Sequence, residues 1–225
     1  KTILTDAGAR VIMLDIDSSA YYCVDITNKK EVDQCFINIK KTHGRLDVLI
    51  NNASVNPVPG SVEAERQFVP YEDYSQELWD KELSVNITGA MFVTQAAVRI
   101  MKKQYSGSII NISSTYGNVG PDNRLYEEGK YKSIAYATTK GAMLNFTRAW
   151  ASYLAGTGIR VNTLSPGGVE DGQPQDFVKA YESKTILGRM ARKDEYNAAI
   201  LFLASDASIY MTGSNFVIDG GWTAW

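Results

Sequence analysis

Tyr136 and Lys140 are the two residues in this sequence whose types and spacing could do chemistry. Residues four apart on a helix share a face, one turn from each other. The unperturbed pKa of a phenol is about 10, so a tyrosine alone is a poor base near neutral pH. A lysine ammonium held close to the phenol favours the ionised form and lowers that pKa. The pair therefore predicts a general acid/base that exchanges a proton with a substrate hydroxyl.

Tyr126 and Lys130 repeat the same spacing, so the two copies must be told apart. Two glutamates and a glycine follow Tyr126; acids raise the pKa of a phenol, and glycine weakens a helix. Small residues and then a long apolar helix follow Tyr136, which leaves room for another molecule to approach its face. We therefore predict that Tyr136 is the functional tyrosine.

The elements that position this pair are expected to form an α/β domain. Apolar runs alternate with amphipathic segments, as in a three-layer, doubly wound parallel sheet of the Rossmann type, folded as a single domain over 1–225. Between these elements, segment 56–74 is predicted to be a surface loop, and 166–190 a mobile cover with a short helix. We expect strands at 10–15, 21–25, 46–51, 107–113, 158–166 and 214–221, and helices at 28–42, 75–103, 133–155 and 192–205.

Polar residues stand where the predicted strands end. In open α/β sheets, ligands bind outside the carboxyl ends of the strands, so these residues predict one shared crevice beside the helix of Tyr136. They are Asp15, Asp25, Asn51 with Asn52, Ser113 with Ser114, and Pro166 with Gly167 and Gly168.

The start of the chain does not fit a complete sheet of this kind. Residues 16–20 alone separate the first two predicted strands, whereas a parallel crossover needs about a dozen residues or more. That spacing suits a hairpin. No glycine-rich phosphate loop precedes 10–15. We therefore expect a first strand, its glycine-rich loop and a crossover helix near 17–21 to be absent from the sequence.

Composition excludes several classes of function. The net charge of −2 provides no basic field for nucleic acid. No apolar run approaches the ~18 residues of a membrane span. One histidine and two scattered cysteines do not make a metal site, and we read His43 as a capping or surface residue. Cys23 and Cys35 are expected to be free thiols, which suits a reducing compartment such as the cytoplasm.

Six segments together resemble the classical short-chain dehydrogenases/reductases. They occur in the family's order over nearly the whole chain, so the resemblance is specific. It implies a Rossmann-type fold, NAD or NADP as cofactor, and reversible hydride transfer between an alcohol and a carbonyl. The segments are NNAS (51–54), SVNITGA with Asn86, GSIINISS (107–114), YATTK (136–140), RVNTLSPGG (160–168) and TGSNFVIDGGW (212–222).

The resemblance also implies residue roles. Tyr136 would be the acid/base, and Lys140 would hold the nicotinamide ribose and lower the tyrosine pKa. Ser114, rather than Ser113, would hydrogen-bond the substrate oxygen. Asn86 would interrupt its helix and hold a water between Lys140 and solvent; the other interpretation is a helix-interior asparagine facing water.

The implied cofactor site decides between NAD and NADP through Asp15. A carboxylate at that strand end accepts hydrogen bonds from a ribose diol and repels a 2′-phosphate, so we predict NAD, with Asp17 as a second candidate for this role. The expected cofactor-binding residues are Asp15, Asp25, Ile26, Asn51, Ala53, Tyr136, Lys140, Pro166, Gly167 and Val169.

The chain departs from the family pattern in two places. Ser114 and Tyr136 are farther apart than usual, and the added segment 117–133 predicts a polar, sugar-like substrate. Asp171 stands where the family often has a threonine that touches the cofactor. The charged or hydroxyl-bearing residues of the added segment are Asp122, Arg124, Tyr126, Glu127 and Glu128.

Three functions remain open from the sequence. The first is an alcohol dehydrogenase or carbonyl reductase, similar to bacterial members associated with flagellin or surface-polysaccharide modification. The others are a sugar epimerase or dehydratase with tightly held NAD, and a non-catalytic dinucleotide-binding protein. Helices 75–103 and 133–155 carry apolar residues on more than one face, which predicts a homo-dimer or homo-tetramer.

Overall fold

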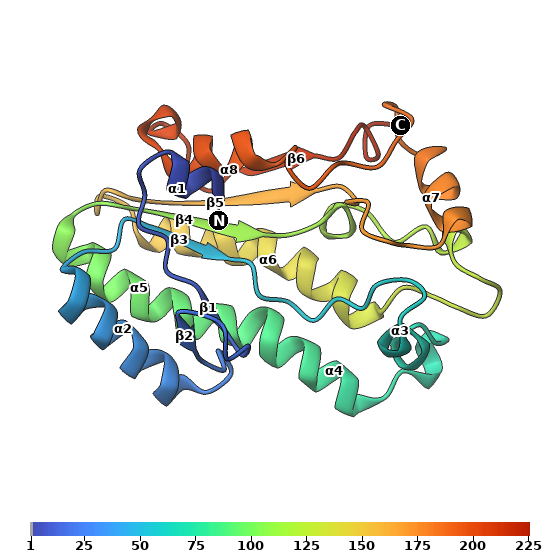
Figure 1. Cartoon of the computed structure of the whole chain (residues 1–225), viewed down its shortest axis with the longest axis horizontal. Helices are drawn as coiled ribbons and strands as arrows, with labels where there is room; N and C mark the ends of the chain where they lie inside the picture. The colour runs from blue at the N-terminus through green and yellow to red at the C-terminus, as the bar shows by residue number, and fades with distance from the viewer. Residues whose placement is uncertain (1) are drawn as a thin grey trace.

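A computed structural model describes residues 2–225 and confirms the predicted fold class, a parallel sheet with helices on both sides (Figure 1). The main sheet has the strand order β3-β4-β5-β6, and every neighbouring pair is parallel. All carboxyl ends therefore lie at one edge, toward the end of the molecule that carries α7 (Figure 1). The four strands are β3 (Val48–Asn51), β4 (Gly107–Ile112), β5 (Ile159–Pro166) and β6 (Asn215–Ile218).

The two central strands, β4 and β5, are largely buried because both of their faces are covered. Ile109 of β4 packs among side chains of α5 (Ala90–Gln104) and α6 (Ile134–Tyr153). Its neighbour Ile110 points to the opposite face and packs against α8 (Asn197–Ala204). This alternation is the ordinary two-residue period of a strand. The core therefore has one layer on each side of the sheet, and α6 is held firmly against β5.

The first two strands form a separate small sheet. β1 (Leu14–Asp15) and β2 (Tyr22–Cys23) form a parallel pair. Only residues 16–21 connect them, and so short a connection suits an antiparallel hairpin. They pair with no strand of the main sheet. Both are shorter than predicted because each has a single neighbour. The next helix, α2 (Lys29–His43), begins at Asn28, whose side chain accepts hydrogen bonds from two backbone N–H groups.

The segment 75–103, predicted as one helix, is interrupted. It consists of α4 (Gln76–Leu83), a π-helical turn (Ser84–Gly89) and α5. Such turns insert one extra residue and are frequent at functional sites. Gly89 ends the turn where the Ile26 side chain presses against the backbone, and a Cβ there would lie 2.7 Å from the isoleucine.

The prediction of a plain loop at 56–74 is wrong. It contains α3 (Val62–Gln67) and a 3₁₀ turn (Tyr71–Asp73). Ser61 begins α3 by accepting a hydrogen bond from the Ala64 N–H, a capping signal present in the sequence. The cover contains the predicted short helix, α7 (Gln175–Glu182). The remaining helical pieces are α1 (Thr2–Asp6) and 3₁₀ turns at Thr115–Gly117, Asn123–Leu125 and Asp206–Ser208.

Two further observations bear on function. None of the helices formed by residues 2–225 combines the length and apolarity needed to cross a bilayer. Within the same residues, no three His, Cys, Asp or Glu side chains are grouped in a way that could hold a metal ion.

Gly158 precedes β5 at a position that only glycine fits. Its φ is +75°, and an added Cβ would lie 2.2 Å from the Tyr105 carbonyl oxygen. We expect Gly158→Ala to lower the free energy of unfolding by more than the ~1–3 kcal/mol of left-handed strain alone, because the backbone contact must also open. Urea unfolding measures the loss.

Gly156→Ala is the matched control. Gly156 has a φ of +74°, but no atom lies within 4 Å of the added Cβ. Equal losses for the two variants would contradict the proposed backbone collision.

Candidate active site

Tyr136 and Lys140 lie on the same face of α6, as their spacing predicts. Tyr136 is 7% exposed and Lys140 5% exposed. The Lys140 ammonium nitrogen lies 5.5 Å from the centre of the Tyr136 ring and donates a hydrogen bond to the Ile112 carbonyl at 3.0 Å. α6 begins at Ser133, whose hydroxyl oxygen accepts the Tyr136 N–H at 3.0 Å. The start of the helix therefore fixes the tyrosine directly.

The two serines after β4 have different partners. The Ser114 hydroxyl lies near the Tyr136 phenol, where it favours the ionised form, and it accepts the Tyr116 N–H at 3.2 Å. The Ser113 hydroxyl instead donates to the Lys140 carbonyl at 2.7 Å, which ties β4 to α6. Gly117 makes this close approach possible, since a Cβ there would lie 2.6 Å from the Lys140 carbonyl oxygen. The geometry thus places Ser114, and not Ser113, beside the tyrosine hydroxyl.

The predicted lowering of the Tyr136 pKa by Lys140 is not what this arrangement produces. Burial raises the pKa of Tyr136 to about 12, and the nearby Ser114 hydroxyl opposes that rise. Burial also lowers the pKa of Lys140 to about 8. For both groups, the effect of burial on the pKa outweighs the attraction between a phenolate and an ammonium, since each group is less stable as an ion away from water.

Asn86 is buried, which excludes the interpretation of an asparagine facing water. It lies in the π-helical turn, and its side-chain oxygen accepts the Val55 N–H at 2.8 Å. Its amide donates to the Thr139 hydroxyl at 3.0 Å. Asn86 therefore links the segment after β3 to the residue next to Lys140, and its interruption of the helix is as predicted.

Two buried charged residues beside Tyr136 were not singled out from the sequence. Lys132 is 4% exposed, and its ammonium lies 4.3 Å from the centre of the Tyr136 ring. Glu82 of α4 has no exposed surface and accepts hydrogen bonds from the hydroxyls of Tyr74 and Ser133. Its second oxygen has no hydrogen-bond partner. Burial raises the pKa of Glu82 and lowers that of Lys132 to about 7.

The competing pair, Tyr126 and Lys130, does not share a helical face. Tyr126 follows a 3₁₀ turn in extended backbone, and Lys130 pairs with Glu65. The Tyr126 ring packs edge-on against Phe68 at 5.2 Å between ring centres, and burial raises its pKa. The structure therefore gives this pair no acid/base arrangement.

Aromatic side chains of the cover and of the added segment surround the site. Tyr126 lies 5.6 Å from Phe177 of α7, and Tyr181 of α7 stacks on Trp222 with 4.3 Å between ring centres. Leu125 and Met190 complete this cluster. The charged residues of the added segment lie elsewhere: Asp122 pairs with Arg124 and Lys184, and Glu127 and Glu128 are exposed. The added segment therefore turns Leu125 and Tyr126 toward this cluster, and Glu127 and Glu128 toward solvent.

The remaining predicted cofactor residues lie at strand ends. Asp15, the last residue of β1, and Asp25, just after β2, are both exposed. The Asp15 carboxylate accepts the Asp17 N–H, and the Asp25 carboxylate accepts the Thr27 N–H. The Asn51 side chain is engaged inside the protein, donating to Asn111 and Thr94. Ala53 is exposed, whereas Ile26 packs against the core around α2.

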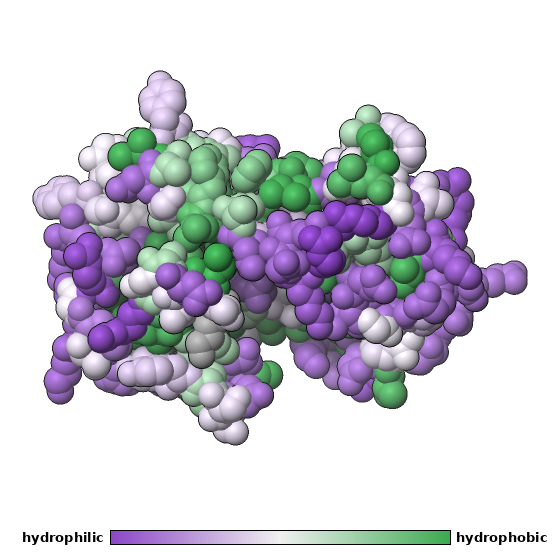
Figure 2. Space-filling model, turned by 45° about the horizontal axis from the view of Figure 1, so that its top comes forward, coloured by the Kyte–Doolittle hydropathy of each residue, from purple (hydrophilic) through white to green (hydrophobic). Residues whose placement is uncertain are grey.

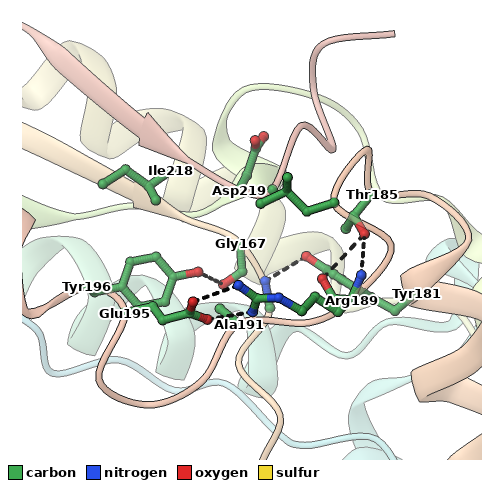
Figure 3. Close-up of a pocket in the computed structure, with 12 residues that line it drawn as sticks. Gly167, Tyr181, Thr185, Arg189, Ala191, Glu195, Tyr196, Ile218 and Asp219 are labelled. Atoms are coloured by element: carbon green, nitrogen blue, oxygen red, sulfur yellow. Dashed lines mark hydrogen bonds and ion pairs between the residues drawn. The ribbon is translucent and has the colours of Figure 1, made fainter.

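The segment after β5 is held by two phenols (Figure 3). The Gly168 N–H donates to the Tyr181 hydroxyl at 2.6 Å, and the Tyr196 hydroxyl donates to the Gly167 carbonyl at 3.0 Å. Val169 pairs with Ala191 in the cover. Asp171, at the site of the expected threonine, forms an ion pair with Lys193 at the surface.

A cavity of about 180 Å³ lies on the far side of this segment, toward β6. The ion pair between Arg189 and Glu195 crosses its wall (Figure 3). On the molecular surface, Figure 2 shows a hollow near the middle of the face between a mixed region and a mainly hydrophilic one. Tyr136 is buried and does not line this cavity. The cavity is therefore separate from the site of Tyr136 and Lys140.

Comparison with known proteins identifies the family. A family model described as enoyl-(acyl carrier protein) reductase matches residues 3–223. The cyclopentanol dehydrogenase of Comamonas sp. is 34% identical over 207 residues, which cover 89% of this chain and 75% of that protein. The chain belongs to the short-chain dehydrogenases/reductases.

Two solved structures of short-chain dehydrogenases/reductases support the same conclusion. A short-chain dehydrogenase from Leptospira borgpetersenii with bound NAD⁺ is 35% identical, with a TM-score of 0.87 over 97% of this chain and 85% of that one. A gluconate 5-dehydrogenase from Burkholderia cenocepacia in complex with NADP and tartrate is 25% identical, with a TM-score of 0.86 over 100% and 89% of the two chains. The family prediction is confirmed, and so is the enzyme class, a dehydrogenase or reductase acting on alcohol and carbonyl groups.

Residues of this chain fit the nicotinamide dinucleotide that short-chain dehydrogenases/reductases use. Exposed carboxylates at the ends of β1 and β2 can accept hydrogen bonds from ribose hydroxyls. Gly167 leaves no room for a larger side chain, since a Cβ would lie 2.8 Å from the Asp219 Cα, so the backbone itself forms the wall there.

Glu82 yields a prediction about stability and pH. Its pKa in the folded protein lies above the ordinary value of 4.5, so its contribution to stability is present at low pH and is lost as pH rises through the folded pKa. An uncharged glutamine has no such loss. We expect Glu82→Gln to gain unfolding free energy relative to wild type as pH rises above about 4.5. Urea unfolding across that range measures the difference, and a constant difference would contradict it.

Proposed function

We propose that this protein interconverts an alcohol and a carbonyl by hydride transfer, with Tyr136 as the acid/base. The observation that supports this most is the convergence of Tyr136, Lys140 and Ser114 at the carboxyl end of β4, all buried and within reach of one another. A bound nicotinamide dinucleotide supplies or accepts the hydride. The protein's own residues move the proton and hold the oxygen.

The proton step assigns a task to each of the four residues. Tyr136 takes the proton of the substrate hydroxyl in oxidation and returns it in reduction. Ser114, which lies near that phenol, donates to the substrate oxygen and stabilises developing negative charge. Lys140 holds a positive charge on the same side of α6 and binds the ribose. Asn86 fixes the adjoining Thr139 and orders the path from Lys140 to solvent.

The substrate class is the finer part of the proposal. The polar residues of 117–133 suggested a sugar-like substrate, as in members associated with flagellin or surface-polysaccharide modification. The aromatic cluster of Tyr126, Phe177 and Tyr181 favours a second candidate, an alicyclic alcohol or ketone. The relative from Comamonas is named for cyclopentanol, and the neighbour from Burkholderia for gluconate. Rates of NADH formation with sugars, nucleotide sugars and alicyclic alcohols decide between the two.

A tightly held NAD in an epimerase or dehydratase, and binding without turnover, are the alternatives. Either would leave no net NADH in that assay. The complete set of Ser114, Tyr136, Lys140 and Asn86 favours turnover.

The domain and its assembly are also proposals. We infer one dinucleotide-binding domain in which a strand would join the two separate sheets, an arrangement supported by their lack of mutual hydrogen bonds. A groove on the outer faces of α5 and α6, lined by Phe146, Trp150 and Tyr153 among others, suits a homo-dimer or homo-tetramer. A small-molecule substrate and a cytoplasmic location complete the proposal.

Tyr136→Phe tests the acid/base directly. The change removes the hydroxyl and keeps the ring, so we expect kcat for hydride transfer to fall at least about a hundredfold. Stopped-flow absorbance of NADH measures the step. Tyr126→Phe is the control, with little expected change; a larger loss from Tyr126→Phe would show that the wrong tyrosine was chosen.

Asp15 tests the cofactor preference. The exposed carboxylate would repel a 2′-phosphate, so we expect Asp15→Ser to raise kcat/KM for NADPH relative to NADH about tenfold, ~1.4 kcal/mol. Asp6→Ser, which removes an exposed carboxylate from α1, is the control. A wild-type enzyme that turns over NADPH far better than NADH would refute the assignment.

A further inference from the structure

Lys132 carries a buried ammonium that has no carboxylate partner. Its nitrogen donates to the side-chain oxygen of Asn56 at 2.7 Å, and no ion pair involves it among residues 2–225. A charge away from water is costly unless neighbouring groups compensate for it. The neighbours of Lys132 therefore indicate what holds it in place.

Two aromatic rings lie against that ammonium, and the nearby Glu82 carboxylate also favours its charged form. The Lys132 nitrogen lies 4.3 Å from the centre of the Tyr136 ring and 5.0 Å from that of Phe68. Both distances are within the range of cation–π attraction, which strengthens when the cation is desolvated. The Lys140 nitrogen lies farther from the same ring, at 5.5 Å. Lys132, which precedes α6, is therefore closer to the Tyr136 ring than Lys140 is.

Other ionisable groups face Tyr136 from each surrounding element. Glu82 faces it from α4, and Tyr181 from α7; both disfavour a phenolate. Tyr116 and Tyr126 lie close by in the segment after β4, and Tyr136 contributes to the rise of their pKa values. The Tyr74 hydroxyl is hydrogen-bonded to both Glu82 and Ser133. Against these acidic groups stand two cations, Lys132 and Lys140.

We propose that Lys132 is a positioning residue that holds a second positive charge against the Tyr136 ring and stabilises its phenolate during proton transfer. The proposal rests on Tyr136 being the acid/base. A phenolate spreads its charge into the ring, so a cation near the ring centre attracts it more than it attracts the neutral phenol. By the same coupling, a phenolate keeps Lys132 protonated.

The readout is the pH dependence of alcohol oxidation by the enzyme with NAD⁺, comparing Lys132→Met with wild type. Methionine fills the space without a charge, so the midpoint of the kcat profile should move up by about one pH unit. The rate below the midpoint then falls about tenfold, and the two rates converge at high pH. KM should be unchanged, and Lys132→Arg should restore the wild-type midpoint.

Lys130→Met is the matched control, because Lys130 lies on the same segment but pairs with Glu65 away from Tyr136. Its midpoint should equal that of wild type. A uniform fall in kcat at every pH for Lys132→Met would show a merely structural role and overturn the proposal. A rise in KM with an unshifted profile would assign Lys132 to substrate binding and overturn it equally.

A second measurement does not depend on turnover. The ¹³Cζ chemical shift of labelled Tyr136, assigned by its loss in Tyr136→Phe, reports the phenol's ionisation with pH. An upward shift of this midpoint in Lys132→Met, in an enzyme with no hydride transfer, would support the role of Lys132 while refuting the proposed function. An unchanged midpoint would overturn the inference alone.

Discussion

The start of α6 brings a phenol and two ammonium groups together where water is nearly excluded, and the surrounding structure must make this arrangement stable. Burial by itself disfavours the ionised phenol and both ammonium ions. Each of these groups therefore has specific neighbours: Ile112 and Asn56 accept from the two lysines, and Ser114 lies near the phenol and favours its ionised form. The same low polarity that makes these charges costly makes their mutual interaction strong.

Several elements converge on this point. The main sheet delivers Ser114 from the end of β4, and Ser113 ties that strand end to the backbone of α6. The π-helical turn directs Asn86 toward Thr139. Ser133 and Glu82 fix the first turn of α6, so the position of the tyrosine backbone depends on a buried carboxylate in another helix. In the cover, the Tyr181 hydroxyl accepts the Gly168 N–H and so ties α7 to the segment after β5.

The sequence predicted the parts of this arrangement that rest on period and spacing. The apolar runs of β4 and β5 identified a buried parallel sheet, and the four-residue spacing of Tyr136 and Lys140 placed both on one face of a helix. The direction of the Tyr136 pKa could not be predicted from spacing, because it depends on how much water the folded chain removes. No pattern in the sequence around Lys132 predicts its burial, because its neighbours Asn56 and Phe68 lie in the distant segment 56–74. The sequence predicts a loop there. The capping pattern at Ser61 was readable, and it would have revealed α3.

The prediction of a polar substrate rests on composition alone. Charge in 117–133 is a property of composition, whereas the surface offered to a ligand depends on which side chains point inward. In the folded chain Leu125 and Tyr126 point into the aromatic cluster, while Asp122 pairs with Arg124. The composition of 117–133 therefore identifies a polar segment, but it does not show which of its side chains point into the protein.

A crystal structure of the enzyme with a nicotinamide dinucleotide and an alcohol would test the central claim most directly. The account predicts that the alcohol oxygen lies within hydrogen-bonding distance of both the Tyr136 and Ser114 hydroxyls, with the Lys140 ammonium on the same side. An alcohol bound instead in the cavity beside Arg189 and Glu195, with Tyr136 still covered by aromatic side chains, would contradict it.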